Sequence, residues 1–228
     1  YNPYTIGYAA DLSDEKNVIK FYENVTKDYP KIDILVNNAI SLNGDRQISE
    51  KKFKDWKKDI TVNIDSMFLL TQKVIGNMRR NSTKGRIVNI SSYASKLRDS
   101  NFHSGTLILS KSLIEKFSTI LADENHKYNI AVTTIRIDEN ILSGSFANIE
   151  KIPIYGKRIQ DKIDKVTDLI ASKPKKLMPM FLYVMKAPYH EIAGKTISSQ
   201  AFTVNPKLSK IVPSYQLVLK DRVLAKVV

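Results

Sequence analysis

Cysteine is absent from this chain of 228 residues. The absence excludes disulfide bonds and cysteine-based zinc sites, and it fits a reducing compartment, so we expect a cytoplasmic protein. Histidine is scarce, and its three residues are far apart and lack the spacing of metal ligands. We therefore expect no metal site.

Long apolar runs are also missing, and none approaches the roughly 18 residues of a membrane-spanning helix. We expect no membrane partner. No Gly-x-Ser-x-Gly elbow is present, which argues against a hydrolase triad. The eight glycines are scattered, and none forms the glycine-rich turn that lets a pyrophosphate approach the backbone.

Positive charge is in excess, with a formal net charge of +13. Such a balance can indicate nucleic acid or an anionic membrane surface. The lysines, however, lie in predicted helices and alternate with acidic residues, as in 50–59. We interpret them as solvated helix faces and expect no nucleic acid partner, with a functional basic patch as the alternative.

Apolar periodicity predicts strands that alternate with long helices. Strands are expected at 5–10, 32–36, 85–92, 130–137 and 195–203. Helices are expected from an N-cap at Ser13 to Pro30, from a start at Ser49, and at 57–79, 105–125, 157–171 and 174–186. This alternation predicts an α/β protein, a Rossmann-like doubly wound parallel sheet in three layers. We expect one domain over 1–203, followed by a tail over 204–228.

The two central helices each carry an apolar stripe. In the first, residues three and four apart predict one buried face throughout, and further apolar residues widen it. In the second, Leu109, Leu113, Phe117 and Ile120 lie on one face. A helix with a wide apolar surface is either deeply covered or at a subunit interface.

The stretch 85–92 and the helix after it carry the candidate chemistry. A β-branched run ends in Ser91 and Ser92, and the following helix carries Lys111. Ligands of open α/β sheets bind at the carboxyl ends of strands. The pattern therefore predicts a ligand site where this strand meets this helix.

Five features in this order resemble the short-chain dehydrogenase/reductase family over roughly residues 5–203. They are Asp11-Leu12 after a strand, Asn37-Asn38-Ala39 after the next, Asn63 in a long helix, Ile90-Ser91-Ser92 after a strand, and Ser110-Lys111. Ile40 stands where the family's Asn-Asn-Ala-Gly motif has its glycine. The resemblance implies an oxidoreductase that uses NAD or NADP on a small carbonyl or alcohol substrate.

The resemblance also implies roles for single residues. Asp11 would accept a hydrogen bond from the adenine amino group, with the Leu12 backbone beside it, and Asn38 and Ala39 would line the adenosine ribose. The three catalytic assignments are Ser92 for the substrate oxygen, Lys111 for the nicotinamide ribose, and Asn63 for a water chain behind the lysine. The helices 57–79 and 105–125 would form subunit interfaces, so we expect a homodimer or homotetramer.

Two departures from the family matter. Leu107 occupies the position of the acid/base tyrosine, four residues before Lys111, and it cannot transfer a proton. Tyr93 and His103 are nearby in sequence and are possible substitutes. The chain also matches the family only from its third strand, so we expect roughly sixty N-terminal residues, one strand–helix–strand unit, to be missing from this sequence. The alternative function is a catalytically inactive relative that binds nucleotide or protein.

Each assignment has a purely structural alternative. Asp11 would belong to a helix start, the asparagines and serines to strand-end turns, Lys111 to a solvated helix face, and Asn63 to a kinked helix.

Overall fold

The computed structural model describes residues 5–43, 47–97, 105–138, 140–141, 171–172 and 174–204. Its main sheet has four parallel strands in the order β1-β2-β3-β6. These are β1 (Ile34–Asn37), β2 (Arg86–Ser92), β3 (Ala131–Ile137) and β6 (Thr196–Ser198). A separate parallel pair joins β4 (Asn140–Ile141) to β5 (Ala171–Ser172).

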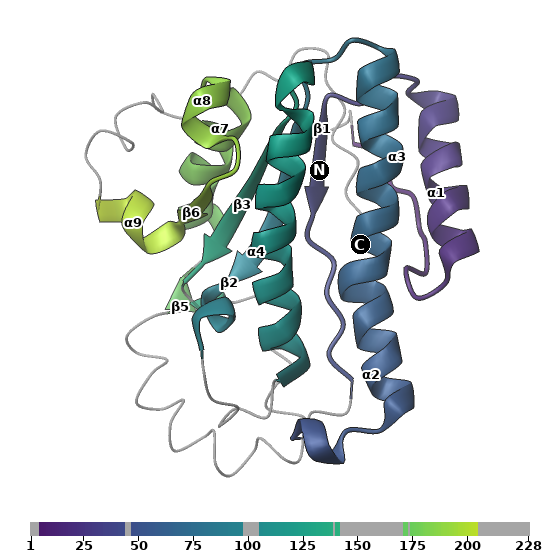
Figure 1. Ribbon diagram of the computed structural model, residues 1–228, viewed down its shortest axis with the longest axis vertical. Helices are drawn as coiled ribbons and strands as arrows, with labels where there is room; N and C mark the ends of the chain where they lie inside the picture. The colour runs from purple at the N-terminus through teal and green to yellow at the C-terminus, as the bar shows by residue number, and fades with distance from the viewer. Residues whose placement is uncertain are drawn as a thin grey trace.

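Helices cover both faces of the sheet (Figure 1). On one face lie α3 (Ser66–Arg80) and α4 (Gly105–Asn125), with α1 (Glu15–Asp28) packed against α3. On the other lie α7 (Met178–Lys186), α8 (Tyr189–Ile192) and α9 (Ser199–Val204). The predicted three-layer α/β fold is confirmed. No helix in the described part of the chain is long and apolar enough to cross a membrane.

Strand β2 shows why the two layers form. Ile87 packs under α3 and α4, whereas Val88 and Ile90 pack under α7. Successive side chains of a strand point to opposite faces, so a strand covered on both sides is apolar in both directions. Asn89 is the exception, because it is fully buried on the α4 side.

A row of buried polar side chains crosses the sheet beneath α3 and α4. The Asn37 amide donates to Thr71 Oγ1 at 3.0 Å and to Asn89 Oδ1 at 2.7 Å. The Asn89 amide in turn donates to Ser118 Oγ at 2.8 Å. Asn37 and Asn89 are also register partners on neighbouring strands. The row therefore ties β1, β2, α3 and α4 together at one level.

The first long helix is continuous but changes pitch in its middle. It runs through α2 (Phe53–Ile60), a π-helical turn η2 (Thr61–Asp65) and α3, and so begins earlier than the predicted 57–79. Asn63 lies in the π turn. Such turns are rare and are frequent at functional sites. Before α2, the expected helix start at Ser49 is only a short 3₁₀ turn, η1 (Ile48–Glu50).

Helix α4 has the predicted bounds, but three residues of its predicted apolar stripe face outward. Leu109, Leu113 and Ile120 are each almost half exposed. The buried side carries Ile114 but is otherwise small or polar, with Thr106, Ser110, Lys111, Ser118 and Ala122. The stripe recognised in the sequence is therefore a surface feature.

The strand predicted at 5–10 does not form, and only Gly7 has an isolated bridge. The segment packs on helix α1 instead. Tyr8 donates its hydroxyl to Asp28 at 2.6 Å, and its ring meets Phe21 edge-on at 6.4 Å between centroids. A strand needs a ladder partner, and in the described chain the outer side of β1 has none. For the same reason β1 is half-buried rather than buried.

Two other boundaries differ from the prediction. The N-cap of α1 is Asp14, whose carboxylate accepts from the Asn17 N–H, and not Ser13. The strand expected at 195–203 ends at Ser198, where α9 begins. Asp138 causes this change, because its carboxylate accepts hydrogen bonds from the Ser198 hydroxyl and the Gln200 N–H.

Beyond residue 142, the sequence predicts helices at 157–171 and 174–186 and a tail over 204–228. The helix at 174–186 exists as a 3₁₀ turn, η6 (Pro174–Leu177), followed by α7. The helix expected at 157–171 falls almost wholly outside the described residues, and so do residues 205–228 of the expected tail. The division into a domain over 1–203 and a tail stays a prediction.

Replacing Asn89 with alanine tests the buried row. The change leaves Asn37 and Ser118 without their shared partner, and an unsatisfied buried group costs about 1–3 kcal/mol. We expect Asn89→Ala to lower the free energy of unfolding in urea by roughly 2–4 kcal/mol. Asn24→Ala on the exposed side of α1 is the matched control. Equal stability of the two variants would contradict the importance of the row.

Candidate active site

The carboxyl end of β2 and the first half of α4 form the candidate site. Lys111 Nζ donates to the Ile90 carbonyl at 2.7 Å. Ser91 Oγ donates to Glu115 Oε1 at 2.8 Å. Two side-chain bonds therefore join the strand end to the helix, at the place where the sequence predicts that they meet.

Lys111 is a buried cation without a carboxylate partner. The residue is 6% exposed, and among the described residues no carboxylate lies within ion-pair distance. Burial lowers the pKa of Lys111 to about 8. The ammonium has three N–H donors, and the Ile90 carbonyl accepts one. Among the described residues, Lys111 therefore keeps two N–H donors without a partner at the strand end. The solvated-face alternative for Lys111 is wrong.

The two serines at the end of β2 have different environments. Ser91 is buried and committed to Glu115, which also accepts from Ser95 at 2.6 Å. Ser92 is half-buried and caps the 3₁₀ turn η3 (Tyr93–Lys96), where its Oγ accepts from the Ala94 N–H at 3.2 Å. Accepting that bond leaves the Ser92 O–H free to donate, so Ser92 is the serine suited to a ligand oxygen.

Leu107 lies one turn before Lys111 on α4 and is half-buried. Its side chain has no titratable group, so the helix face toward the site carries no proton donor at this position. Tyr93 directly follows Ser92 and is 55% exposed. His103, the other possible substitute, lies outside the described residues.

Asn63 faces the segment that follows β1 rather than Lys111. Its Oδ1 accepts from the Ser41 N–H at 2.6 Å, and its Nδ2 donates to the Ser41 carbonyl at 3.0 Å. Nδ2 also lies 3.4 Å from Ser110 Oγ, next to Lys111 in the chain. Asn63 therefore connects the post-β1 segment to the lysine helix, and its predicted role in a water chain stays a prediction.

The four residues assigned to adenosine lie near the ends of β1 and the start of α1. Asp11 is exposed, and its Oδ1 accepts from both the backbone and the hydroxyl of Ser13, which lowers the pKa of Asp11. Leu12 is buried under α1. Asn38 and Ala39 are exposed immediately after β1. Three of the four are thus accessible, and the Leu12 side chain is part of the core.

Sequence reasoning missed two polar centres at this edge. Glu115 lies one turn after Lys111 and accepts from two serines, with Arg136 at 3.8 Å. Asp59 is fully buried and pairs with Lys51 at 2.8 Å. Glu115 could have been found from the sequence, because its i, i+4 spacing from Lys111 places both residues on the same face of the helix. Asp59 gave none, because it lies among alternating lysines and aspartates.

The burial of Lys111 predicts a pH-dependent stability. Since its pKa is about 8 in the folded chain and 10.5 otherwise, the unfolded chain binds more protons between these values. The cost of burying the charge is present below pH 8 and disappears as pH rises. We expect the unfolding free energy of wild type minus that of Lys111→Met to rise by roughly 3 kcal/mol between pH 7 and 10.5.

Urea unfolding at several pH values measures this difference. Lys116→Met, on the exposed side of the same helix, is the matched control for the loss of a lysine from α4. A flat profile for Lys111→Met would show that Lys111 is not desolvated.

Comparison with known protein families gives a match over residues 2–138 to the family model for short chain dehydrogenases. Among curated relatives, the chain is 32% identical over 134 residues to 2-dehydro-3-deoxy-D-gluconate 5-dehydrogenase of Dickeya dadantii, covering 57% of this chain and 50% of that protein. It is 32% identical over 133 residues to the NAD-dependent glycerol dehydrogenase of Listeria innocua, covering 58% and 50%.

Among solved structures, NAD⁺-bound xylitol dehydrogenase superposes with a TM-score of 0.69 at 22% identity, covering 84% of this chain and 76% of that one. This similarity shows the fold. The chain spans about half the length of the curated relatives named above. The family model, however, covers more than half of this chain. The protein belongs to the short-chain dehydrogenase family.

Proposed function

We propose that this protein is an NAD(P)-dependent oxidoreductase that interconverts a small carbonyl compound and its alcohol. The observation that carries the proposal is Lys111, a buried ammonium without a carboxylate partner, held at the end of β2 near the half-buried Ser92. An unpaired buried charge is costly and is typical of a functional site. Two relatives named above are described as NAD-dependent or NAD⁺-bound.

The residues of this chain fit the riboses and the adenine of a dinucleotide better than its pyrophosphate. Lys111 has two N–H donors left for ribose hydroxyls. The Oδ2 of Asp11 is not used in its bonds with Ser13, so it is free to accept from an adenine amino group. Asn38 and Ala39, which are assigned to the adenosine ribose, are exposed directly after β1. This sequence contains no glycine-rich turn of the kind that binds a pyrophosphate.

The chain's own residues orient the reaction. When bound, the dinucleotide would supply or accept the hydride. Ser92 donates its free O–H to the substrate oxygen, while Lys111 holds the ribose and keeps a positive charge close to the reacting centre. Leu107 supplies no proton, so the proton reaches the oxygen from another group or from water. The inactive relative is the second candidate function, and Leu107 is the observation that favours it.

NADH and NADPH binding by the full-length protein, followed by turnover against a panel of carbonyl compounds, tests the proposal. We expect binding and slow turnover. Leu107→Tyr should raise turnover by roughly 10²–10⁴-fold, the usual contribution of a positioned acid or base. Leu107→Phe is the matched control, because it adds the ring without the hydroxyl.

The outcomes separate the two candidate functions. Absence of binding to either dinucleotide would refute the oxidoreductase. Binding without turnover, in wild type and Leu107→Tyr alike, would support the inactive relative.

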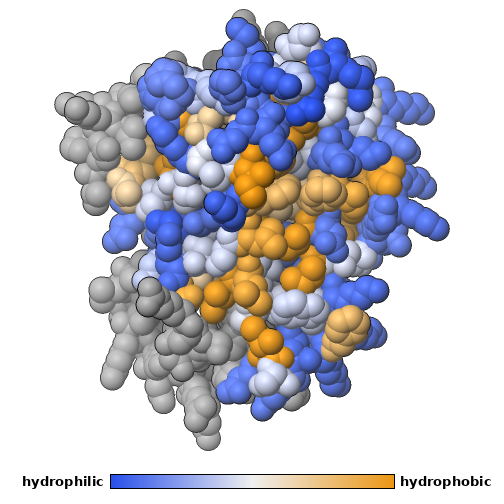
Figure 2. All heavy atoms as spheres, viewed as in Figure 1, coloured by the Kyte–Doolittle hydropathy of each residue, from blue (hydrophilic) through white to orange (hydrophobic). Residues whose placement is uncertain are grey.

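We also propose that α3 and α4 pack against a second copy of the chain in a homodimer or homotetramer. Figure 2 shows an apolar band over these helices. Its exposed members on the two helices are Phe68, Leu109, Leu113 and Ile120. Contiguous exposed apolar surface is typical of an interface. The cytoplasmic localisation expected from the sequence stays a prediction.

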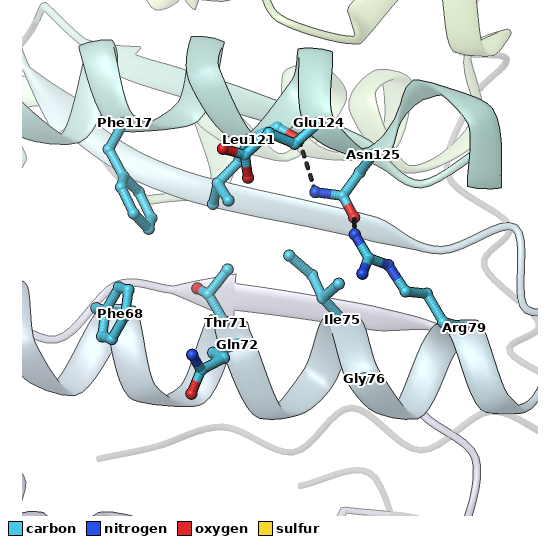
Figure 3. A pocket seen from close by; sticks show the side chains of 10 residues that line it. All are labelled: Phe68, Thr71, Gln72, Ile75, Gly76, Arg79, Phe117, Leu121, Glu124 and Asn125. Carbon is cyan, nitrogen blue, oxygen red and sulfur yellow. Dashed lines mark hydrogen bonds between the residues drawn. The ribbon is translucent and has the colours of Figure 1, made fainter.

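A groove between the two helices lies within this band and encloses about 270 Å³ (Figure 3). Phe68 and Phe117 face each other across it, with ring centroids 6.3 Å apart. At the other end Arg79 donates to Asn125 Oδ1 at 2.8 Å and covers the Tyr128 ring. The groove thus has an apolar floor and a polar end, which suits apolar side chains from a partner.

Light scattering of Leu113→Glu tests the assembly. A buried, unpaired carboxylate disfavours the interface, so the variant should shift to a smaller species than wild type. Asn24→Glu, with the same charge change on exposed α1, should leave the mass unchanged. A monodisperse wild-type monomer would refute the proposal.

A further inference from the structure

One buried carboxylate holds a short segment that follows β1, Ser41 to Asn43. Asp59 is fully buried on α2. Its Oδ1 accepts from the Ser41 hydroxyl at 3.2 Å, the Asn43 N–H at 2.8 Å and the Asn43 amide at 2.9 Å. This one oxygen therefore binds a backbone group of Asn43 and the side chains of both Ser41 and Asn43.

Lys51 completes the arrangement from the other side. Its Nζ pairs with Asp59 Oδ2 at 2.8 Å and donates to the Asn43 carbonyl at 2.7 Å. The Lys51 side chain is 6% exposed. We name this group of contacts the Lys51–Asp59 clamp. It satisfies a backbone donor and a backbone acceptor of the same residue, Asn43, with two opposite charges.

A buried ion pair such as Lys51–Asp59 contributes little net free energy to folding. Desolvation of two charges offsets most of their attraction, and well-packed apolar residues often stabilise a fold as well. In the described part of the chain Asp59 and Lys111 are buried charged residues, and the side chains of Lys51 and Asp138 are only 6% exposed. The observation that the clamp is directed at a loop, and not at the core, indicates a positioning role.

The clamped segment lies at the edge of the sheet that carries the candidate site. It follows the carboxyl end of β1, and ligands of open parallel sheets bind outside such ends. Asn63 holds the backbone of Ser41 and lies 3.4 Å from Ser110. The segment is therefore fixed on one side by the clamp, and on the other it is connected to the helix that carries Lys111.

We propose that Lys51 and Asp59 are positioning residues that fix Ser41 to Asn43 as one wall of the dinucleotide site. The inference rests on the proposed function. Since the clamp touches neither Lys111 nor Ser92, loosening it weakens dinucleotide binding and leaves the chemical step nearly unchanged.

The experiment compares Asp59→Asn and Lys51→Met with wild type. Hydrogen–deuterium exchange of peptides spanning 41–43 reports on the segment without any dinucleotide. We expect exchange there to rise and the Kd for NADH to increase by roughly tenfold, the effect of losing one charge-assisted hydrogen bond. The kcat should stay within about twofold, since transition-state contacts are retained.

Two further variants control for general destabilisation. Lys51→Arg keeps the charge and should restore part of the affinity. Lys31→Met removes the exposed pair with Asp33, in which both side chains are well exposed, and should behave like wild type. If Asp59→Asn does not fold, Lys51→Met carries the same comparison.

Each failure is distinguishable. Unchanged exchange over 41–43 in both clamp variants overturns the positioning role even where wild type binds NADH. Faster exchange with an unchanged Kd overturns the link to the dinucleotide. A wild-type protein that binds neither NADH nor NADPH overturns the proposed function, and the role in binding with it.

Discussion

The hydrogen bond between Asn37 and Asn89 joins neighbouring strands inside an apolar sheet, and much of the structure depends on it. Both residues also bond to helices, through Thr71 on α3 and Ser118 on α4. A buried polar network is favourable only when every member has its partners. Strand register, helix position and helix rotation are therefore set together.

This constraint explains why α4 is inverted relative to its apolar stripe. The side that meets the sheet has to supply the Ser118 hydroxyl and the Lys111 ammonium, and Ile114 is buried between them. Leu109, Leu113 and Ile120 are consequently turned outward. The proposed site and the proposed interface thus lie on opposite sides of one helix, so packing of a second copy on the outer side would hold the inner side rigid.

Sequence periodicity was sufficient for the parts of the fold that local pattern determines. The bounds of α4 and the strand ending at Ser92 were predicted, as was the meeting of Lys111 with that strand end. Tertiary partners decided the rest. Residues 5–10 have strand composition but no ladder partner, and the helix at Ser199 depends on Asp138, sixty-one residues earlier in the chain. The Lys51–Asp59 clamp had no local pattern, because Ser41, Asn43 and Lys51 lie 18, 16 and 8 residues before Asp59 in the chain.

The groups at the end of β2 are suited to positioning a ligand, and a group that moves a proton is missing at Leu107. Lys111 and Ser92 lie at the end of β2, whereas Asn63 faces the segment after β1, which the Lys51–Asp59 clamp also holds. Leu107 removes a single hydroxyl. Burial that places the pKa of Lys111 near 8 is costly at neutral pH. A buried lysine whose described partner is a single carbonyl costs stability, so it supports the proposal of a bound ligand at this edge more strongly than that of any particular reaction.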